Sequence, residues 1–322
     1  MIPTARMAHA SRAFEISDLA LDVDRPECVL ATASGDLFMS DARGGVTHRS
    51  RDGVTRLIAG KGRSADFLPN GIALLRDRSF LIANLGSEGG VWRLTEGGDL
   101  TPWLMEVNGT PLPACNFVGI DAEDRVWISV STRRVPRWDA YQCNAAHDGF
   151  VVLVDRAGAR IAAEGFHYTN EAKVDPSGRW LYVNETAGRR LNRVALDARG
   201  NLGAREIVAE FGAGTFPDGL AFDVEGSVWV TSVVSNRLFR VWPDRGKVEL
   251  VFEDLDESLV ELIEGKFSSG VFPGLKPGMN GISSLAFGGP DLRMVYLGYS
   301  KGNRISSLKS PVAGVAPPHW HF

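Results

Sequence analysis

Short runs of apolar residues alternate with small polar and turn-forming residues along the whole chain, and little of the sequence has the 3.6-residue spacing of a helix. Apolar triplets such as Val126-Trp127-Ile128 and Val228-Trp229-Val230 stand between turn formers. Runs of this kind, bounded by Gly, Asp and Asn, are typical of short β-strands. The 36 glycines among 322 residues exceed the ordinary share and fit a chain with many turns.

One strand–turn–strand unit recurs six times. The copies begin at Glu27, Asn70, Asn116, Asn170, Asp218 and Ser283. Each copy has apolar residues two and four positions after its first residue, and most have a turn former eight positions after it. The alternative, a β-sandwich with repeated hairpins, fits six copies matching at four offsets poorly.

The spacing of the copies predicts the architecture. The starts lie 43 to 65 residues apart, close to the 40–50 residues of one four-stranded propeller blade. We therefore expect an all-β, six-bladed β-propeller that spans residues 1–322 as a single domain. Because the last unit ends after Ser307, the segment near Phe14 is expected to complete the sixth blade and close the ring.

The first residue of each copy is expected to lie in a ring around the central channel, because innermost strands line that channel. All six side chains carry oxygen, and Glu27 and Asp218 are acids. Such a set suits a hard divalent cation, Ca2+ above all, with Mg2+ and Mn2+ as alternatives. The absence of His and Cys makes Zn2+ a weaker alternative. The competing interpretation is that the Asn and Asp residues are turn formers that bond their own backbone.

Several motifs carry a family resemblance. They are Pro26-Glu27, Cys115-Asn116, Thr169-Asn170, Asp175-Pro176-Ser177-Gly178, Phe216-Pro217-Asp218-Gly219-Leu220 and Leu285-Ala286-Phe287-Gly288-Gly289. With them the chain resembles the SMP-30/gluconolactonase/luciferin-regenerating-enzyme (LRE)-like family over essentially its full length. The resemblance implies one divalent ion, usually calcium, at one mouth of the propeller. It implies Glu27, Asn170 and Asp218 as metal ligands, Asn116 as a further ligand or substrate contact, and Asp218 as the general base.

The chain also departs from the family pattern. Phe117 and Glu171 follow the asparagines of the third and fourth copies, where the family often has Gly. Glu171 is a candidate for substrate binding if it faces the pocket rather than the opposite side of its strand. Asn70 is a further candidate for contact with substrate or water.

The expected chemistry is hydrolysis of a small lactone. A divalent ion polarises the carbonyl, and a carboxylate takes a proton from the attacking water. No Gly-x-Ser-x-Gly motif is present, so a covalent serine mechanism has little support. Two alternatives stay open: a metal-dependent phosphotriesterase-like hydrolase, and a non-catalytic propeller that binds a ligand or protein around a structural metal.

Two stretches interrupt the regular spacing. Ser131 to Asp148 is long for a hairpin connection, and Arg133 within it is a candidate for gripping a substrate carboxylate, unless the stretch is a solvated basic loop. Leu255 to Gly278 has leucines at helical spacing and predicts a short amphipathic helix. Such a helix forms a lid or an oligomer contact, or packs on the body.

Composition narrows the setting. The 35 Lys and Arg against 39 Asp and Glu, a net charge of −4, argue against nucleic-acid binding. No apolar window reaches the length of a membrane span, and the first residues do not resemble a secretory signal. Three cysteines exclude a disulfide scaffold. We expect a cytoplasmic monomer or small homo-oligomer whose partner is a small lactone, with residues 317–322 as a tail packed on the surface.

Overall fold

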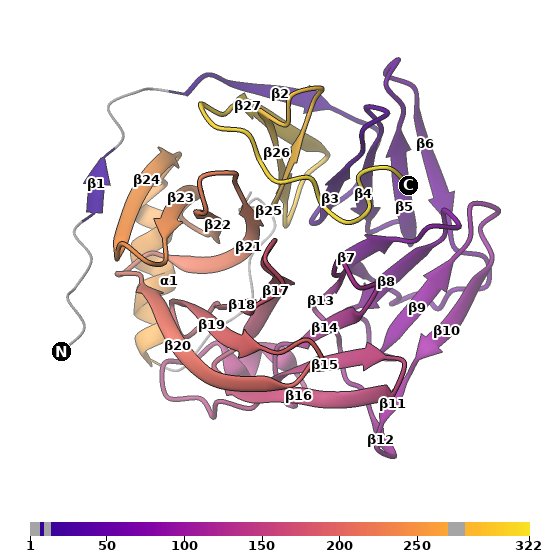
Figure 1. Cartoon of the computed structure of the whole chain (residues 1–322), viewed down its shortest axis with the longest axis horizontal. Coiled ribbons are helices and arrows are strands. Elements are labelled where there is room, and N and C mark those ends of the chain that lie inside the picture. Colours follow the sequence, from indigo (N-terminus) through magenta and orange to yellow (C-terminus); the bar gives the residue numbers. More distant parts are fainter. Residues whose placement is uncertain (1–6, 10–13, 270–280) are drawn as a thin grey trace.

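Six sheets are arranged radially around a central channel (Figure 1), as the six-copy repeat predicts. The structure is a computed structural model and describes residues 7–9, 14–269 and 281–322. Blades 1 to 3 consist of β3 (Val29–Ala31), β4 (Leu37–Asp41), β5 (Gly45–Arg49) and β6 (Thr55–Ala59); β7 (Pro69–Leu74), β8 (Phe80–Asn84), β9 (Val91–Leu94) and β10 (Leu100–Leu104); and β13 (Phe117–Ile120), β14 (Val126–Val130), β15 (Gly149–Asp155) and β16 (Gly158–Phe166).

The second half of the ring repeats the same order of strands. Blades 4 to 6 consist of β17 (Thr169–Val174), β18 (Trp180–Glu185), β19 (Arg190–Leu196) and β20 (Leu202–Glu210); β21 (Phe216–Phe222), β22 (Val228–Val233), β23 (Arg237–Trp242) and β24 (Lys247–Glu253); and β25 (Ile282–Gly288), β26 (Met294–Tyr299) and β27 (Arg304–Lys309) with β2 (Ile16–Ala20). A short β1 (Met7–His9) pairs in parallel with β24, and β11 (Glu106–Val107) and β12 (Thr110–Pro111) form a hairpin between blades 2 and 3.

The ring closes as predicted, with a strand from near the N-terminus. β2 lies antiparallel to β27 as the outermost strand of blade 6, with Ile16 opposite Leu308 (Figure 1). The pairing covers the edge of β27, which would be exposed if blade 6 consisted of β25, β26 and β27 alone.

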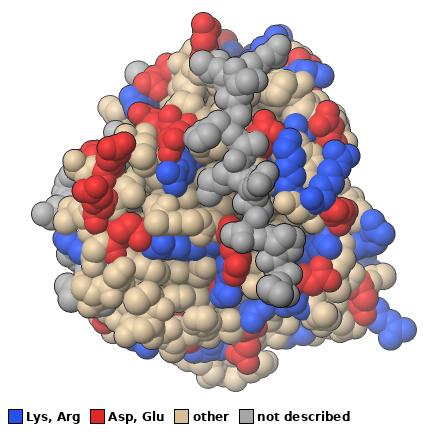
Figure 2. Space-filling model, turned by 90° about the vertical axis from the view of Figure 1, so that its left-hand side faces the viewer, with Lys and Arg blue, Asp and Glu red and all other residues tan. Residues whose placement is uncertain are grey.

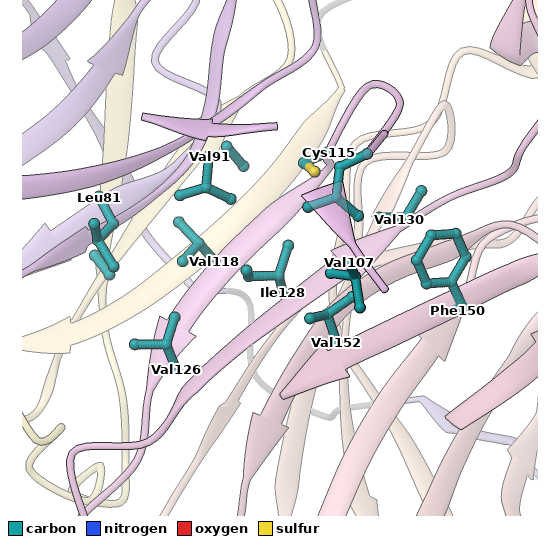
Figure 3. Packing of buried hydrophobic residues seen from close by; sticks show 13 residues of the cluster. Leu81, Val91, Val107, Cys115, Val118, Val126, Ile128, Val130, Phe150 and Val152 are labelled. Carbon is teal, nitrogen blue, oxygen red and sulfur yellow. The ribbon is translucent and has the colours of Figure 1, made fainter. Parts of the chain in front are cut away.

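Apolar side chains fill each interface between neighbouring blades. The residue two positions after each repeat start is buried in every copy: Val29, Ile72, Val118, Ala172, Leu220 and Leu285. Figure 3 shows one interface, where Leu81 and Val91 of blade 2 meet Val118 and Ile128 of blade 3. Burial of such side chains, at about 25 cal/mol per Å2 of apolar surface, holds the blades together.

Both long insertions pack over the ends of the strands that carry the repeat starts. The predicted helix is α1 (Glu257–Ser269), and residues 270–278 of its predicted range lie outside the described residues. Its Phe267 contacts Phe216, and it shares a buried cluster with Ala140 of the short 3₁₀ helix η1 (Arg137–Ala140) in the other insertion. The two insertions thus flank one mouth of the channel.

The C-terminal tail crosses the opposite mouth. The Ala33 N–H in the β3–β4 turn donates to the Trp320 carbonyl, and the Val315 N–H donates to the Phe222 carbonyl. On the face of the molecule in Figure 2, Lys and Arg are interspersed with Asp and Glu, in keeping with the small net charge. Among the described residues, no helix has both the length and the hydropathy needed to cross a membrane.

Candidate functional site

Irregularities in the innermost strands determine where the ring residues lie. The register shifts between Pro69 and Ile72 in β7, and corresponding shifts occur in β17 and β21 around Asn170 and Asp218. A β-bulge bends its strand and redirects a side chain. Side chains that follow the repeat starts alternate between the two faces of the sheet and enter the blade interfaces. At the bulges this alternation is interrupted, so the polar side chains of Asn70, Asn170 and Asp218 take a different direction.

The structure gathers four of the predicted ring residues at one mouth, all buried: Glu27, Asn70, Asn170 and Asp218. The Asn70 amide donates to Glu27 Oε1 at 3.0 Å, and Asn170 forms a hydrogen bond with the Asp218 carboxylate. Asn116 is also buried, and its backbone carbonyl accepts a second bond from the Asn70 amide at 2.7 Å. One chain of hydrogen bonds thus joins blades 1 to 3, and a separate contact joins blades 4 and 5.

The two acids of the ring repel one another in this buried setting. Burial raises the pKa of Glu27 to about 7, Arg25 opposes that rise and Glu171 adds to it. Burial also raises the pKa of Asp218 well above its usual range, reinforced by the negative charges of Glu27 and Glu171. A positive charge placed between the two carboxylates would relieve this cost.

Two amide oxygens of the ring lack partners. Asn116 Oδ1 and Asn170 Oδ1 are buried without a hydrogen-bond partner among the residues that the structure describes. The Asn170 nitrogen donates to Thr186 Oγ1 at 2.9 Å, which fixes the amide with its oxygen free. Leaving a buried acceptor unsatisfied costs about 1–3 kcal/mol, so a ligand that such oxygens can bind would stabilise the site.

These oxygen donors are of the kind that a hard cation binds. No group of three or more His, Cys, Asp or Glu side chains in the described ranges is arranged to hold a metal ion. A metal at this mouth therefore needs the asparagine oxygens in addition to Glu27 and Asp218. Mixed carboxylate and amide oxygens are ligands typical of Ca2+.

Glu171, which follows the ring asparagine of blade 4, is buried and close enough to affect both ring acids. Its Oε2 is held by the Lys173 ammonium at 2.6 Å and by the Leu220 N–H at 2.9 Å. Glu171 thus places negative charge beside the ring, and its Oε2 is occupied by the bonds to Lys173 and the Leu220 N–H.

The remaining predicted residues lie differently. The Ser283 hydroxyl donates to the Glu27 backbone carbonyl at 2.9 Å and so ties blade 6 to blade 1. Arg133 points toward the outer strands of blade 3, where it pairs with Glu164 at 3.2 Å and stacks on Phe150. Asn70 is fully engaged, since its oxygen accepts from Arg25 while its nitrogen donates to the ring.

Two arginines at this mouth escaped the sequence analysis. Arg25 reaches Asn70 Oδ1 at 2.6 Å from a turn with a φ of 53°, and Arg137 of η1 donates to the Tyr168 hydroxyl at 3.1 Å. The charges of both arginines lower the pKa of Glu27. In the sequence, Arg25 could have been noticed because it stands two residues before Glu27, and Arg137 because it lies in an unusually long loop. That loop contains several arginines, however, and no rule selects one of them.

The far mouth of the channel has the opposite character. It holds a cavity of about 280 Å3 with mainly apolar walls, to which Ile72, Leu74 and Phe117 contribute. His319 of the C-terminal tail lines it, with Nε2 buried and unpartnered among the described residues. The ring residues do not line this cavity, so the cavity and the polar cluster are separate features.

Comparison with known proteins agrees with this architecture. A family profile described as "SMP-30/Gluconolactonase/LRE-like region" matches residues 25–252. A 6-deoxy-6-sulfogluconolactonase of Pseudomonas putida is 29% identical over 276 residues, which cover 83% of this chain and 80% of that protein.

Solved structures share the fold. A gluconolactonase of Xanthomonas campestris superposes with a TM-score of 0.66 at 19% identity, covering 92% of this chain and 89% of its own. A protein described as calcium-binding, regucalcin of Agrobacterium tumefaciens, gives a TM-score of 0.66 at 18% identity, covering 94% and 95%.

Proposed function

The chain belongs to the SMP-30/Gluconolactonase/LRE-like family, and we propose that it is a lactone hydrolase that works with one divalent cation. The residues proposed to hold the cation are Glu27, Asn116, Asn170 and Asp218. Asp218 is also the proposed general base.

The observation that carries the proposal is the pairing of unsatisfied oxygens with crowded carboxylates. Asn116 Oδ1 and Asn170 Oδ1 are buried without partners among the described residues. Burial raises the pKa of both Glu27 and Asp218, and the charge of Glu171 raises both further, as does that of Glu27 at Asp218. Each feature alone lowers stability. A cation among the four groups would offset both costs at once.

When bound, the cation would supply positive charge that keeps both carboxylates ionised and polarises a lactone carbonyl oxygen. Asp218 would take a proton from the water whose oxygen attacks the carbonyl carbon. Cleavage of the ring C–O bond would then release an alkoxide, which takes the proton back from Asp218 to give the open hydroxy acid and restore the base. Asn70 would hold the Glu27 carboxylate in position, because its nitrogen donates to Glu27 Oε1.

Calcium is the preferred ion for this set of donors. All four groups offer oxygen, and no His or Cys takes part, which favours a hard cation over Zn2+. The regucalcin neighbour is described as calcium-binding, and both lactonases among the relatives have names that state lactone hydrolysis.

The test is hydrolysis of a panel of sugar, aliphatic and aromatic lactones by the full chain, followed with a pH indicator. The protein is first stripped with a chelator and then assayed with Ca2+, Mg2+, Mn2+ or Zn2+. Turnover that returns with a metal supports the proposal. Tight metal binding without turnover of any lactone, or of phosphotriesters tested beside them, would instead favour a binding protein with a structural ion. An absence of metal binding by calorimetry would overturn the assignment of the ligands.

A further inference from the structure

Two guanidinium groups stand beside the ring. Arg25 is joined to the ring acid through a single amide, since its Nη2 donates to Asn70 Oδ1 at 2.6 Å and Asn70 donates to Glu27 Oε1 at 3.0 Å. Arg137 lies close enough for its charge to act on both Arg25 and Glu27. Neither side chain is fully buried.

Both arginines keep donors in reserve. The bonds of Arg25 go from Nη1 to the Pro69 carbonyl and from Nη2 to Asn70, and Arg137 uses Nη1 for the Tyr168 hydroxyl. A guanidinium carries five N–H groups, so most of them remain available. Within the described part of the chain, neither arginine forms an ion pair with a carboxylate.

The charges near the ring show why these donors matter. Lys173 already balances Glu171 through a 2.6 Å ion pair. If a divalent cation balances Glu27 and Asp218, Arg25 and Arg137 contribute two further positive charges, and among the described residues only the charge of Arg25 has another acid, Asp24, acting on it. Excess buried positive charge is costly until an anion arrives.

We infer that the lactone carries an anionic group, and that Arg25 and Arg137 bind that group while its ring lies at the metal. Guanidinium forks match carboxylate, sulfonate and phosphate oxygens in bidentate fashion, so an anion of this chemistry fits. The inference rests on the proposed function for the position of the lactone. Arg137 is the specificity-determining residue to test, since Arg25 also positions Asn70 in the ring.

The experiment compares two lactones that differ only in the anion: glucono-1,5-lactone and 6-phosphoglucono-1,5-lactone. D-glucaro-1,4-lactone, which carries a carboxylate, is the third substrate. We expect the wild type to favour the charged lactones by at least about 10-fold in kcat/KM. In Arg137→Gln, kcat/KM for the charged lactones should fall by about 10- to 100-fold, mainly through KM, with the neutral lactone within about 3-fold.

Two further variants separate recognition from folding. Arg134→Gln removes the same charge from an exposed position in the same loop and should leave the preference intact. Arg137→Lys keeps the charge without the fork and should restore part of the preference. Thermal unfolding of each variant checks that the fold is retained.

The outcomes distinguish this inference from the proposed function. Equal kcat/KM for charged and neutral lactones, or equal losses for both in Arg137→Gln, would overturn anion recognition and leave the lactonase standing. If no lactone is turned over, binding of 6-phosphogluconate by calorimetry decides the matter. Binding weakened about 10-fold or more by Arg137→Gln would support the anion site without the lactonase, and no binding to the wild type would overturn it.

Discussion

The two mouths of the central channel are built from the same six inner strands, yet they differ in nearly every chemical respect. One mouth gathers carboxylates, amide oxygens left without partners and two arginines under a pair of insertions. The other is mainly apolar, and the C-terminal tail crosses it above a cavity of about 280 Å3. The six inner strands themselves do not determine which end of the channel carries the polar cluster. What differs is where the strands bulge and which end the tail covers.

The two mouths have opposite effects on the free energy of unfolding. At the ring mouth, repelled acids and unsatisfied oxygens lower stability and prepare a site for ligands. At the tail mouth, apolar burial stabilises the closed ring. Burial and the nearby charge of Lys173 lower the pKa of His319 to about 4, although a hydrogen bond to the Ala31 carbonyl opposes this shift. Substitutions at the first end should therefore change chemistry, and those at the second should change stability.

The largest effect is expected from Asp218→Asn at the ring mouth. Loss of the proposed base should lower kcat for the best lactone by about 100- to 10,000-fold. The assay uses saturating metal, and calorimetry measures metal affinity separately, because Asp218 is also a proposed ligand. Asp244→Asn, an exposed acid paired with Arg193, is the matched control and should leave kcat unchanged. Activity of Asp218→Asn within a few-fold of the wild type would show that another group takes the proton.

The pH dependence of stability should also follow the ring mouth. In metal-free protein the raised pKa of Glu27, about 7 against the ordinary 4.5, means that the folded state holds a proton which the unfolded state has released. Stability should then fall as pH rises from about 4.5 to above 7, by roughly 3 kcal/mol for this one group. Chemical unfolding at a series of pH values measures the slope. Glu27→Gln should flatten it, and a slope that the substitution leaves unaltered would point to other groups.

Asn170→Ala should weaken binding of the cation. Removing one of the unpartnered oxygens is expected to lower metal affinity by about 10- to 100-fold, measured by calorimetry on chelator-treated protein. The metal-free protein should lose about 1–2 kcal/mol of stability, because the Asn170 nitrogen donates to Thr186 Oγ1 in a buried setting. Asn201→Ala, an exposed surface asparagine, serves as the control. Unchanged metal affinity would remove Asn170 from the ligand set.

The smallest effect on chemistry is expected at the tail mouth. Trp320 packs in part against the core between blades 6 and 1, and its carbonyl accepts the Ala33 N–H. Trp320→Ala should lower the free energy of unfolding by about 2 kcal/mol, measured by denaturant titration, with kcat/KM within about 2-fold. A large loss of activity in a variant that remains folded would mean that the two mouths are coupled.

Much of the scaffold was predictable because it repeats. The buried residue two positions after each start, the turn that follows and the closing strand at Ile16 all obey local rules that six copies reinforce. The same repetition predicted the polar ring, and the family resemblance selected Glu27, Asn170 and Asp218 within it. The helix in the second insertion was likewise visible from the spacing of Leu259 and Ile263.

What the sequence left open depends on contacts that do not repeat. Arg133 and Arg137 stand in the same loop, and only the fold shows that the first turns to Glu164 while the second turns to Tyr168. The full engagement of Asn70 depends on Arg25, whose direction follows from a single left-handed turn. The tail's path over the far mouth likewise lacks a local signal, because its contacts are with turns of distant blades.

The closure of blade 6 by β2 has a consequence for how the chain is made. Ile16 is synthesised before blades 1 to 5, but its partner Leu308 is synthesised only after them. Blades 1 to 5 can pair their neighbouring strands as they appear, whereas the final sheet waits for the two distant segments to meet. Until Leu308 has been synthesised, the nascent protein is therefore an open arc with an unpaired strand, and the ring forms only after that point.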